Sequence, residues 1–526
     1  MKKFKRVVVI SIMLCLLFTL SAGCGSAKNG TDTTTAEKVT SEASETAPVK
    51  PKQEKPFIFY TRTYLGNEAK PDNQKVLEEL INKSGIKFEV VAVPQETYRD
   101  KLNLMFASGE VFDGFDVGVS GIHWGEWAAK GSIKPINDIL KNAPNLMKYI
   151  EPGLKTVTDV AGKIYSIPRR ERFPTGFVPT VREDWLKKFG MNMPQTIVEL
   201  EAYMDACITK DPNGNGQKDE FALVPSWNFA GLTTNFTALF TGKHGMFYLS
   251  DDGKIMPIYA HPGYKTMVGK FAEWYKKGYI HPEYLVIKSA QINDLMLADR
   301  VGMTAGWYSA GIPNSVIMRE KNPEVKYTPL ANLKDAPGKP SWGSNPKYQA
   351  QICIPSTSTQ AEYLINYLDW LASDPANALT AEKGLENVHW KWTDSSKKSY
   401  ELIGNASEKY NNFYFILGMY FDGFYPSQSV VEGNTVQYEY SLHEALLSKM
   451  SFVEEDDFFV PYNYKGTPAE GVGNDAQTSI SEAITRIIMG ELSINDWDKA
   501  LENYMKLGGS VLSEVRTQQY NSFTKK

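Results

Sequence analysis

The chain has 526 residues, of which 57 are basic and 61 acidic, so its formal net charge is −4. This mild acidity excludes the strongly basic surface that proteins use to bind nucleic-acid phosphates. The length exceeds what one hydrophobic core usually serves, so we expect two folded lobes.

The first residues are typical of a secretory signal. Basic residues within 2–6 precede an apolar run over 7–20 and a small-residue exit that ends at Cys24. The exit resembles a bacterial lipobox, in which the cysteine is acylated and becomes the first mature residue, although Ser21 stands where that motif more often has Leu. The alternative is an uncleaved membrane anchor. Both interpretations place the folded part outside the cytoplasmic membrane.

A signal peptide over residues 1–23 leaves a polar stretch, 24–56, before the folded part. This stretch contains Thr, Ser, Ala, Glu, Lys and Pro with almost no large apolar residue, so it cannot bury enough surface to fold. We expect a disordered tether with a reach of roughly 30 Å.

The folded part begins with alternating strands and helices. Residues 55–64 form a β-rich run, residues 73–84 carry apolar residues at helical spacing, and residues 86–93 form a second β-rich run. A helix over 97–108 and a strand over 112–119 follow. Short apolar strands that alternate with amphipathic helices indicate an α/β fold with a mostly parallel sheet.

The same alternation continues toward the C-terminus, without an internal repeat. The further predicted strands are 178–181, 300–307, 324–330 and 349–354, and the further predicted helices are 182–189, 196–209, 264–277, 361–373, 479–489 and 493–507. Cys207 is thus predicted on a helix and Cys353 on a distant strand. The two could pair, but two separate buried thiols are the better expectation.

Residues 211–220 place oxygen-bearing side chains at alternate positions, as a calcium loop requires. The candidate ligands are Asp211, Asn213, Asn215, Gln217 through its carbonyl, Asp219 and Glu220. Gly216 stands at the sixth position, where an EF-hand loop needs a sharp turn. The twelfth position is Ala222 rather than a bidentate carboxylate, so either Glu220 closes the shell or the segment is only an Asn/Gly turn. An enclosed ion of this kind has a structural role.

Motifs along nearly the whole folded part resemble the extracellular solute-binding lipoproteins of bacterial ABC importers, family 1, which serve oligosaccharides. They are Cys24, Val181–Leu186, Pro194 with Thr196, the loop 211–220, Val301–Met303 with Gly306 and Trp307, Gly384–Glu386 with His389 and Trp390, and Asp496 with Trp497. The resemblance implies two hinged α/β lobes with a central cleft, the type II periplasmic-binding-protein-like fold. It also implies a structural calcium ion with Glu220 as a ligand, as in alginate-binding members.

The resemblance further implies the lobe boundaries. The first lobe would comprise 57–167 and 327–381, and the second 168–318 and 382–526, with the calcium loop in the second lobe.

Aromatic residues make up 12% of the chain, and several fall at strand ends or in loops. Sugars offer a flat C–H face ringed by hydroxyls, so a sugar site needs aromatic plates with polar neighbours. Trp307, followed by Tyr308, is the best candidate plate, because it follows a predicted strand at the edge where open α/β sheets bind ligands. The alternative is that Trp307 packs under a loop.

The remaining candidates carry weaker signals. The other proposed ligand-binding residues are Tyr60, Tyr64, Trp124, Trp227, Trp342 and Trp390, each of which could instead be a buried ring. Arg62, Arg169, Arg170 and Arg172 could bind uronate or sulfate groups, but such clusters are more often ion-paired. Trp185, Trp274, Trp370 and Trp497 lie on helical patterns and are expected in the core.

These observations predict a lipid-anchored, monomeric binding protein on the outer face of the cytoplasmic membrane. It would capture an oligosaccharide between its lobes and deliver it to ABC permease subunits, without catalysis and without nucleic acid. Two alternatives remain open at this stage. One is an extracellular glycoside hydrolase, which needs only a pair of carboxylates, and the other is a peptide-binding receptor of the same fold.

Overall fold

The computed structural model describes residues 53–63, 69–117, 124–171, 174–226, 228–338, 340–394, 396–412, 427–429, 436–457 and 459–525. Contacts divide the chain into residues 1–52 and 53–526, and only the second unit contains described residues. The predicted signal, Cys24 and nearly all of the predicted tether therefore lie outside the described part. Within that part, no helix is long and apolar enough to span a membrane.

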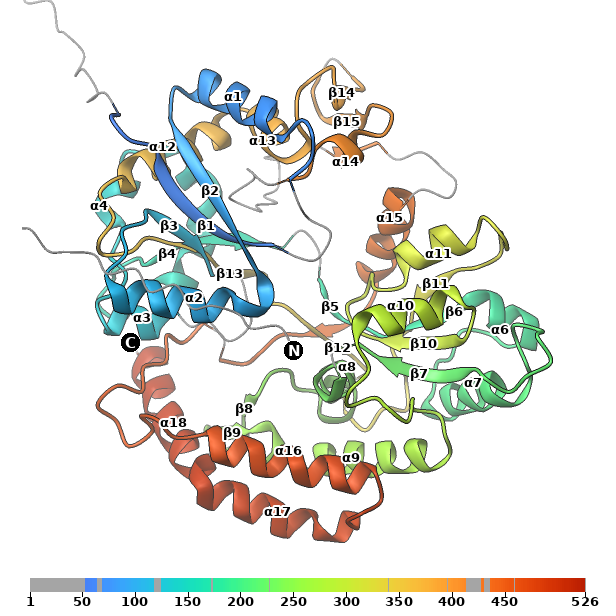
Figure 1. The fold of residues 1–526 in the computed structure, drawn as a ribbon. Coiled ribbons are helices and arrows are strands. Elements are labelled where there is room, and N and C mark those ends of the chain that lie inside the picture. The colour runs from blue at the N-terminus through green and yellow to red at the C-terminus, as the bar shows by residue number, and fades with distance from the viewer. Residues whose placement is uncertain are drawn as a thin grey trace, which may run out of the picture. The chain divides into compact units, whose positions relative to one another are not determined.

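A five-stranded sheet forms the first lobe, in the order β2-β1-β3-β13-β4 (Figure 1). Its strands are β1 (Phe57–Thr63), β2 (Phe88–Pro94), β3 (Gly114–Asp116), β4 (Ser166–Arg170) and β13 (Tyr348–Cys353). β1 runs parallel to β2 and β3, as the alternating pattern predicts. β13 is antiparallel to β3 and β4, so the chain returns to this sheet from a distant segment and leaves it mixed.

Helices cover this first sheet with apolar faces. They are α1 (Asn73–Ser84), α2 (Gln95–Ser108), α3 (Trp124–Ala129), α4 (Asn137–Leu140), α5 (Pro144–Ile150), α12 (Ala361–Ser373) and α13 (Pro375–Lys383). α1 buries Val76 and Leu80 and ends at Gly85, whose φ of 68° lets its N–H close the last turn on the Ile81 carbonyl. α12 packs against α5 and α13, which ties the two separate parts of the lobe together.

A four-stranded sheet forms the second lobe, in the order β11-β6-β10-β7. Its strands are β6 (Thr180–Arg182), β7 (Phe221–Pro225), β10 (Val301–Ala305) and β11 (Tyr327–Pro329). β10 runs parallel to β7 and antiparallel to β6. β11 pairs with β6, so Tyr327–Pro329 belongs to this second sheet and not to the first lobe, where the sequence prediction places it. That boundary was carried over from the family resemblance, which does not fix the strand at which this chain returns to the first lobe.

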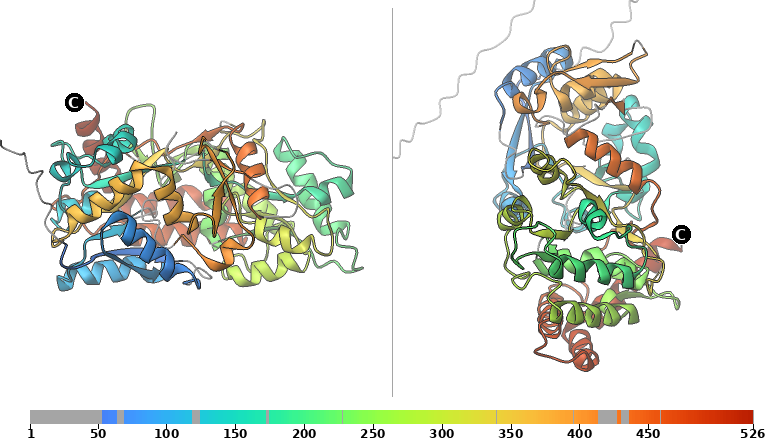
Figure 2. Two further views of the ribbon diagram at one scale, coloured as in Figure 1. Left: turned by 90° about the horizontal axis from the view of Figure 1, so that it is seen from above. Right: turned by 90° about the vertical axis from the view of Figure 1, so that its right-hand side faces the viewer.

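The second lobe carries most of the helices. They are α6 (Glu183–Phe189), α7 (Ile197–Thr209), α8 (Asn228–Thr241), α9 (Pro262–Lys276), α10 (Ser289–Leu297), α11 (Ile312–Met318), α15 (Val436–Leu447), α16 (Asn474–Ile488), α17 (Trp497–Tyr504) and α18 (Ser510–Thr524). α16 packs on both α9 and α17. Figure 2 shows the red C-terminal helices and the green segment that contains α9 from two further sides. Trp185, Trp274 and Trp497 are fully buried, as expected of core residues.

Two small sheets complete the described fold. One is the hairpin of β8 (Phe247–Leu249) and β9 (Ile255–Pro257). The other contains β14 (Trp390–Trp392), β15 (Ser399–Leu402) and β16 (Ser427–Gln428), and the short helix α14 (Ala406–Lys409) lies between β15 and β16 in the chain. The sequence prediction assigns residues 382–412 to the second lobe. They contact the first, because Asp72 donates its N–H to the Lys409 carbonyl and Tyr410 joins the first core.

Cys207 and Cys353 are both buried and unpaired, in separate cores, which confirms the prediction of two separate thiols. Burial raises the pKa of both thiols, that of Cys353 to about 12, so both are protonated at neutral pH.

Candidate functional site

Two segments of the chain cross between the lobes through one short sheet. The chain passes from β4 through β5 (Gly176–Phe177) into β6, and returns from β11 through β12 (Trp342–Ser344) into β13. β5 and β12 pair antiparallel, and β17 (Phe452–Val453) joins the other edge of β12. We call β5, β12 and β17 the connecting sheet. A Cβ on Gly176 would lie 2.0 Å from the Gly343 carbonyl oxygen, so this crossing requires glycine.

Trp307 lies beside the connecting sheet, two residues after the end of β10. It forms a β-bridge with Phe177 of β5, and their ring centroids are 5.4 Å apart at 85°. Both side chains are half-buried, so each retains an accessible apolar surface. Tyr308 is only 6% exposed, and its N–H donates to the Gly176 carbonyl at 3.2 Å. Trp307 and Phe177 therefore form an aromatic pair at the crossing, with Tyr308 beneath it.

Polar side chains lie where β4 and β13 join the segments that enter the connecting sheet. Arg169 Nη2 donates to Glu171 Oε1 at 2.5 Å, and Gln349 Nε2 donates to the same oxygen at 2.6 Å. The side chains of Arg169 and Glu171 are 23% and 13% exposed. Arg170 pairs with Tyr348 in the ladder, and Arg172 lies outside the described residues. The expected arginine cluster is thus ion-paired, at least through Arg169.

The ends of β1 and β3 carry a second ion pair. Arg62 Nε donates to Asp116 Oδ2 at 2.9 Å, and Gln351 Nε2 donates to Asp116 Oδ1 at 2.7 Å. Tyr60 is buried and donates its hydroxyl to Glu110, and burial together with that carboxylate raises the pKa of Tyr60 to about 12. Tyr60 is therefore a neutral hydrogen-bonding group at every physiological pH.

The other predicted aromatic candidates are distributed differently. Trp124 is 7% exposed and stacks on Tyr165, while Trp342 and Trp390 are fully buried and donate their indole N–H groups to the carbonyls of Leu330 and Gly384. Tyr64 and Trp227 lie outside the described residues. Trp342 and Trp390 thus present no surface to a ligand in this structure, because their ring N–H groups are already satisfied within the core.

The calcium loop is organised around the Asp211 carboxylate. This group accepts backbone N–H groups from Gly214, Asn215 and Gly216 at 2.9–3.1 Å, and Asp211 itself has a φ of 46°. Asn215 donates its amide to Asp219, whose carboxylate also pairs with Arg300 at 3.0 Å. The Asp211 carboxylate therefore fixes the turn of this loop by binding three backbone N–H groups.

Glu220 is the unusual member of this loop. It is 6% exposed, and within the described part of the chain neither of its buried carboxylate oxygens has a hydrogen-bond partner. Burial raises the pKa of Glu220, and the neighbouring Asp211 and Asp219 raise it further. Among the described residues no cluster of three or more His, Cys, Asp or Glu side chains is arranged for a metal, so a cation here would depend on the Asn and backbone oxygens as well.

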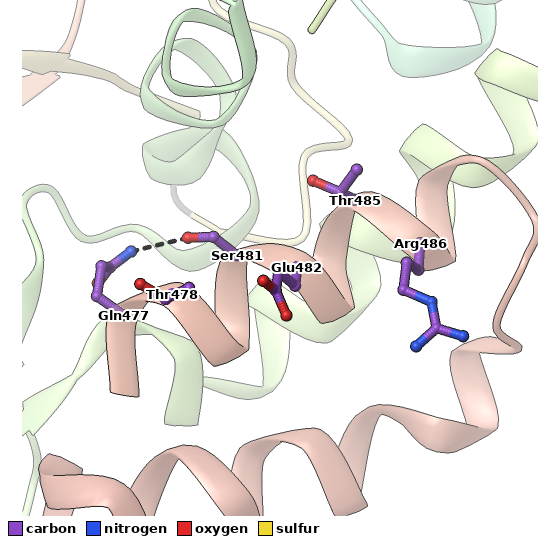
Figure 3. Close-up of a pocket in the computed structure, with 6 residues that line it drawn as sticks. All are labelled: Gln477, Thr478, Ser481, Glu482, Thr485 and Arg486. Atoms are coloured by element: carbon purple, nitrogen blue, oxygen red, sulfur yellow. Dashed lines mark hydrogen bonds between the residues drawn. The ribbon is translucent and has the colours of Figure 1, made fainter. Parts of the chain in front are cut away.

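A pocket of about 510 Å³ lies elsewhere, on α16 of the second lobe. Figure 3 shows its six lining residues on that one helix, with Gln477 donating to Ser481 at 3.0 Å. The lining has no aromatic plate, unlike the connecting sheet.

Several residues of the aromatic and polar group were not predicted. Phe177 contacts Trp307, and Glu171 contacts Arg169 and Gln349. Phe177 was missed because a strand as short as β5 gives no periodic signal. His443 on α15 was also missed. Its buried ring lies between the Tyr308 carbonyl at 3.2 Å and the Tyr327 carbonyl at 2.8 Å, so it ties α15 to the segment after Trp307.

Residues 66–378 match the family model of bacterial extracellular solute-binding proteins. Lipoprotein LipO of Bacillus subtilis strain 168 is 24% identical over 87% of this chain and 91% of its own. The fructooligosaccharide ABC transporter substrate-binding protein FusA of Streptococcus pneumoniae is 29% identical over 53% of this chain and 54% of its own. The polygalacturonan/rhamnogalacturonan-binding protein YtcQ of B. subtilis is 24% identical over 73% and 74%.

Solved structures share the fold. FusA in complex with kestose superposes with a TM-score of 0.67 at 19% identity, covering 90% of this chain and all of that one. A FusA EF-hand mutant in complex with fructo-nystose also gives a TM-score of 0.67. It is 18% identical, and the match covers 90% of this chain and 100% of that one. The alginate-binding protein AlgQ2 without calcium ion gives 0.64 at 18% identity, over 89% and 99%. The predicted two-lobed α/β fold class is thereby confirmed.

Proposed function

Because the chain belongs to the bacterial extracellular solute-binding proteins, we propose that it captures an oligosaccharide at the connecting sheet and delivers it to an ABC permease. The observation that carries the proposal is the half-exposed aromatic pair, Trp307 and Phe177, beside the hydrogen-bonding group Arg169, Glu171 and Gln349. Aromatic faces match the C–H face of a sugar ring, and planar polar groups match its hydroxyls.

The proposed ligand-binding set is Trp307, Phe177 and Tyr308 from the second lobe, with Tyr60 and Trp124 from the first. Tyr308 and Tyr60 are buried beneath the accessible surface and would act mainly by support and hydrogen bonding. We leave out Trp342 and Trp390, because each is fully buried and has its N–H satisfied.

The proposed mechanism is closure of the two lobes around the bound sugar by bending at the connecting sheet. Both lobes contribute side chains at this sheet, so a ligand that touches both favours the closed form by its differential affinity. A permease that recognises the closed form would then receive only loaded protein. Small-angle scattering tests this step, because an unchanged radius of gyration at saturating sugar would contradict closure.

Calcium in the loop 211–220 is part of the proposal. The donors would be the side chains of Asp211, Asn213, Asn215, Asp219 and Glu220, with the Gln217 carbonyl. The support is the buried Glu220 carboxylate, because a buried charge without a partner is costly and a divalent cation would remove that cost. The ion would fix the loop that follows α7, far in sequence from Trp307, and has no part in sugar contacts.

Lipid anchoring through Cys24 is likewise proposed, from the lipobox-like exit and the lipoprotein relative LipO. The protein would stand on the outer face of the cytoplasmic membrane as a monomer. Metabolic labelling with an alkyne fatty acid tests the anchor, since Cys24→Ser should abolish labelling.

One experiment tests the function as a whole. We expect isothermal titration with a panel of oligosaccharides to give heat with at least one of them, and chromatography of the same samples to give no cleavage products. Cleavage would support a glycoside hydrolase instead. Silence to every sugar, with heat from oligopeptides, would support a peptide receptor of this fold.

A further inference from the structure

Two arginines of the first lobe, Arg169 and Arg62, are each paired with a carboxylate of the described chain. Arg169 pairs with Glu171, and Arg62 pairs with Asp116. The side chains of Arg62 and Asp116 are 10% and 8% exposed. A glutamine donates to each carboxylate as well, Gln349 to Glu171 and Gln351 to Asp116. A carboxylate on a ligand could use either arginine only by breaking one of these pairs and leaving a buried acid without its cation.

The Glu171 carboxylate keeps acceptor capacity for a hydrogen-bond donor on the ligand. Arg169 and Gln349 both donate to Glu171 Oε1, so a carboxylate, which has two acceptor oxygens, can still accept from an incoming hydroxyl. The negative charge of Glu171 repels a carboxylate on the ligand.

Further acids stand where β17 leaves the connecting sheet. Glu454 accepts the Lys347 N–H at 3.2 Å, and Glu455 follows it. Burial raises the pKa of both, that of Glu455 to about 6.

We propose that the site selects an uncharged oligosaccharide and discriminates against glycans that bear carboxylates. The proposal rests on the sugar-binding function above and deepens it. It places the ligand of this chain with the fructooligosaccharide class that FusA is named for, rather than with the polygalacturonan class that YtcQ is named for.

The test uses the mature protein and matched sugars in isothermal titration. One arm contains uncharged trimers and tetramers of fructan, glucan, galactan and mannan. The other contains uronate trimers of pectin and alginate, together with the methyl ester of the pectin trimer, which keeps its shape and loses its charge. The tightest ligand is expected in the uncharged arm, and the methyl ester should bind at least about tenfold tighter than its free acid, because no like charge then approaches Glu171.

The outcomes separate this inference from the proposed function. If a uronate is the tightest ligand, the inference is overturned and the sugar-binding function stands. If no sugar of either arm binds, the proposed function fails, and the inference fails with it.

A charge-neutral variant tests the same point from the protein side. Glu171→Gln keeps an acceptor for Gln349 but leaves Arg169 without its carboxylate, so the preference for methyl ester over free acid should fall about tenfold. Glu324→Gln, at an exposed carboxylate paired with Lys187, is the matched control and should keep the wild-type preference. An unchanged preference in Glu171→Gln would contradict the role of this pair, and the wild-type panel decides the selectivity even if the variant folds poorly.

Discussion

Glu171 and Glu220 are both largely buried carboxylates, yet their surroundings differ. Glu171, beside the connecting sheet, receives one hydrogen bond from Arg169 and one from Gln349. Glu220, at the end of the predicted calcium loop, has no hydrogen-bond partner among the described residues for either buried oxygen, and Asp211 and Asp219 stand near it. The comparison teaches that Glu171 is neutralised from within the chain, whereas Glu220 is the carboxylate that our calcium proposal would neutralise from outside.

The strongest way to break this comparison is to remove calcium. At a free concentration a hundredfold above Kd, the ion should stabilise the fold by about 3 kcal/mol, and a chelator should remove that contribution. Thermal melts with and without chelator measure it. Asp211→Ala combined with Asp219→Ala, and separately Glu220→Gln, should lose most of the response.

Glu324→Gln serves as the matched control and should respond like the wild type. In chelator, Glu220→Gln should be more stable than the wild type, because an amide is cheaper to bury than an unpaired carboxylate. A double variant that still responded fully to the chelator would remove the metal proposal.

A second test concerns His244, a half-buried residue that forms a β-bridge with Glu455 and whose ring lies against Gly343 of the connecting sheet. Burial lowers the pKa of His244 to about 4, below its usual value near 6.5. Between these values the unfolded chain binds the extra proton and the folded protein does not, so stability falls as the pH falls. We expect His244 to contribute a loss of about 2 kcal/mol between pH 7.5 and pH 5.

Urea unfolding at the two pH values, with His244→Gln compared against its own stability at pH 7.5, measures this contribution. Glu455 has the opposite sign, because burial raises its pKa to about 6 and acid then stabilises the folded state. Glu455→Gln should therefore steepen the loss in acid, and equal pH profiles for both variants and the wild type would exclude this account.

Trp307 tests the ligand side of the comparison. Trp307→Ala removes the larger plate of the aromatic pair and should weaken sugar binding about tenfold, or roughly 1.4 kcal/mol, while Trp307→Phe should retain part of the affinity. Titration with the best sugar of the panel measures the change. Trp370→Ala, on α12 against Tyr367, should lower stability and leave affinity unaltered. Unaltered affinity in Trp307→Ala would move the site away from this residue.

Arg300 gives the smallest expected effect and tests how a neighbouring positive charge influences the predicted calcium loop. Its pair with Asp219 is partly exposed, at 31% and 26%, so Arg300→Gln should cost less than about 1 kcal/mol. The same change removes a positive charge beside the ion, so calcium affinity should rise severalfold in a fluorescent-chelator competition. Arg300→Lys keeps the charge and should show no such rise.

Sequence patterns were most informative where a helix has one apolar face and a clear end. The predicted bounds 73–84 and 361–373 match α1 and α12, since apolar residues recur every three to four positions and Gly85 ends α1. α8 was missed because its small and threonine-rich sequence packs on several sides and lacks a polar face. The two-residue strand β5 was missed because it is too short to show alternation.

The candidate site shows the same limit. Trp307 was predictable because it follows a buried strand, but its partners come from β5, β4 and β13, and only the topology brings them together. Likewise, Arg169 stood out as a charge cluster, whereas its neutralisation by Glu171 depends on side-chain geometry that spacing does not reveal.

The close approach of Gly176 to Gly343 has a mechanical consequence. The two crossings in the connecting sheet share one ladder of only two residue pairs, Gly343 with Phe177 and Ser344 with Gly176, so a rotation of one strand is passed to the other. These two strands therefore bend as one joint rather than as two independent joints. A bulkier residue at Gly176 would clash with the Gly343 carbonyl, and one at Gly343 would clash with the His244 ring, so either change would distort this joint.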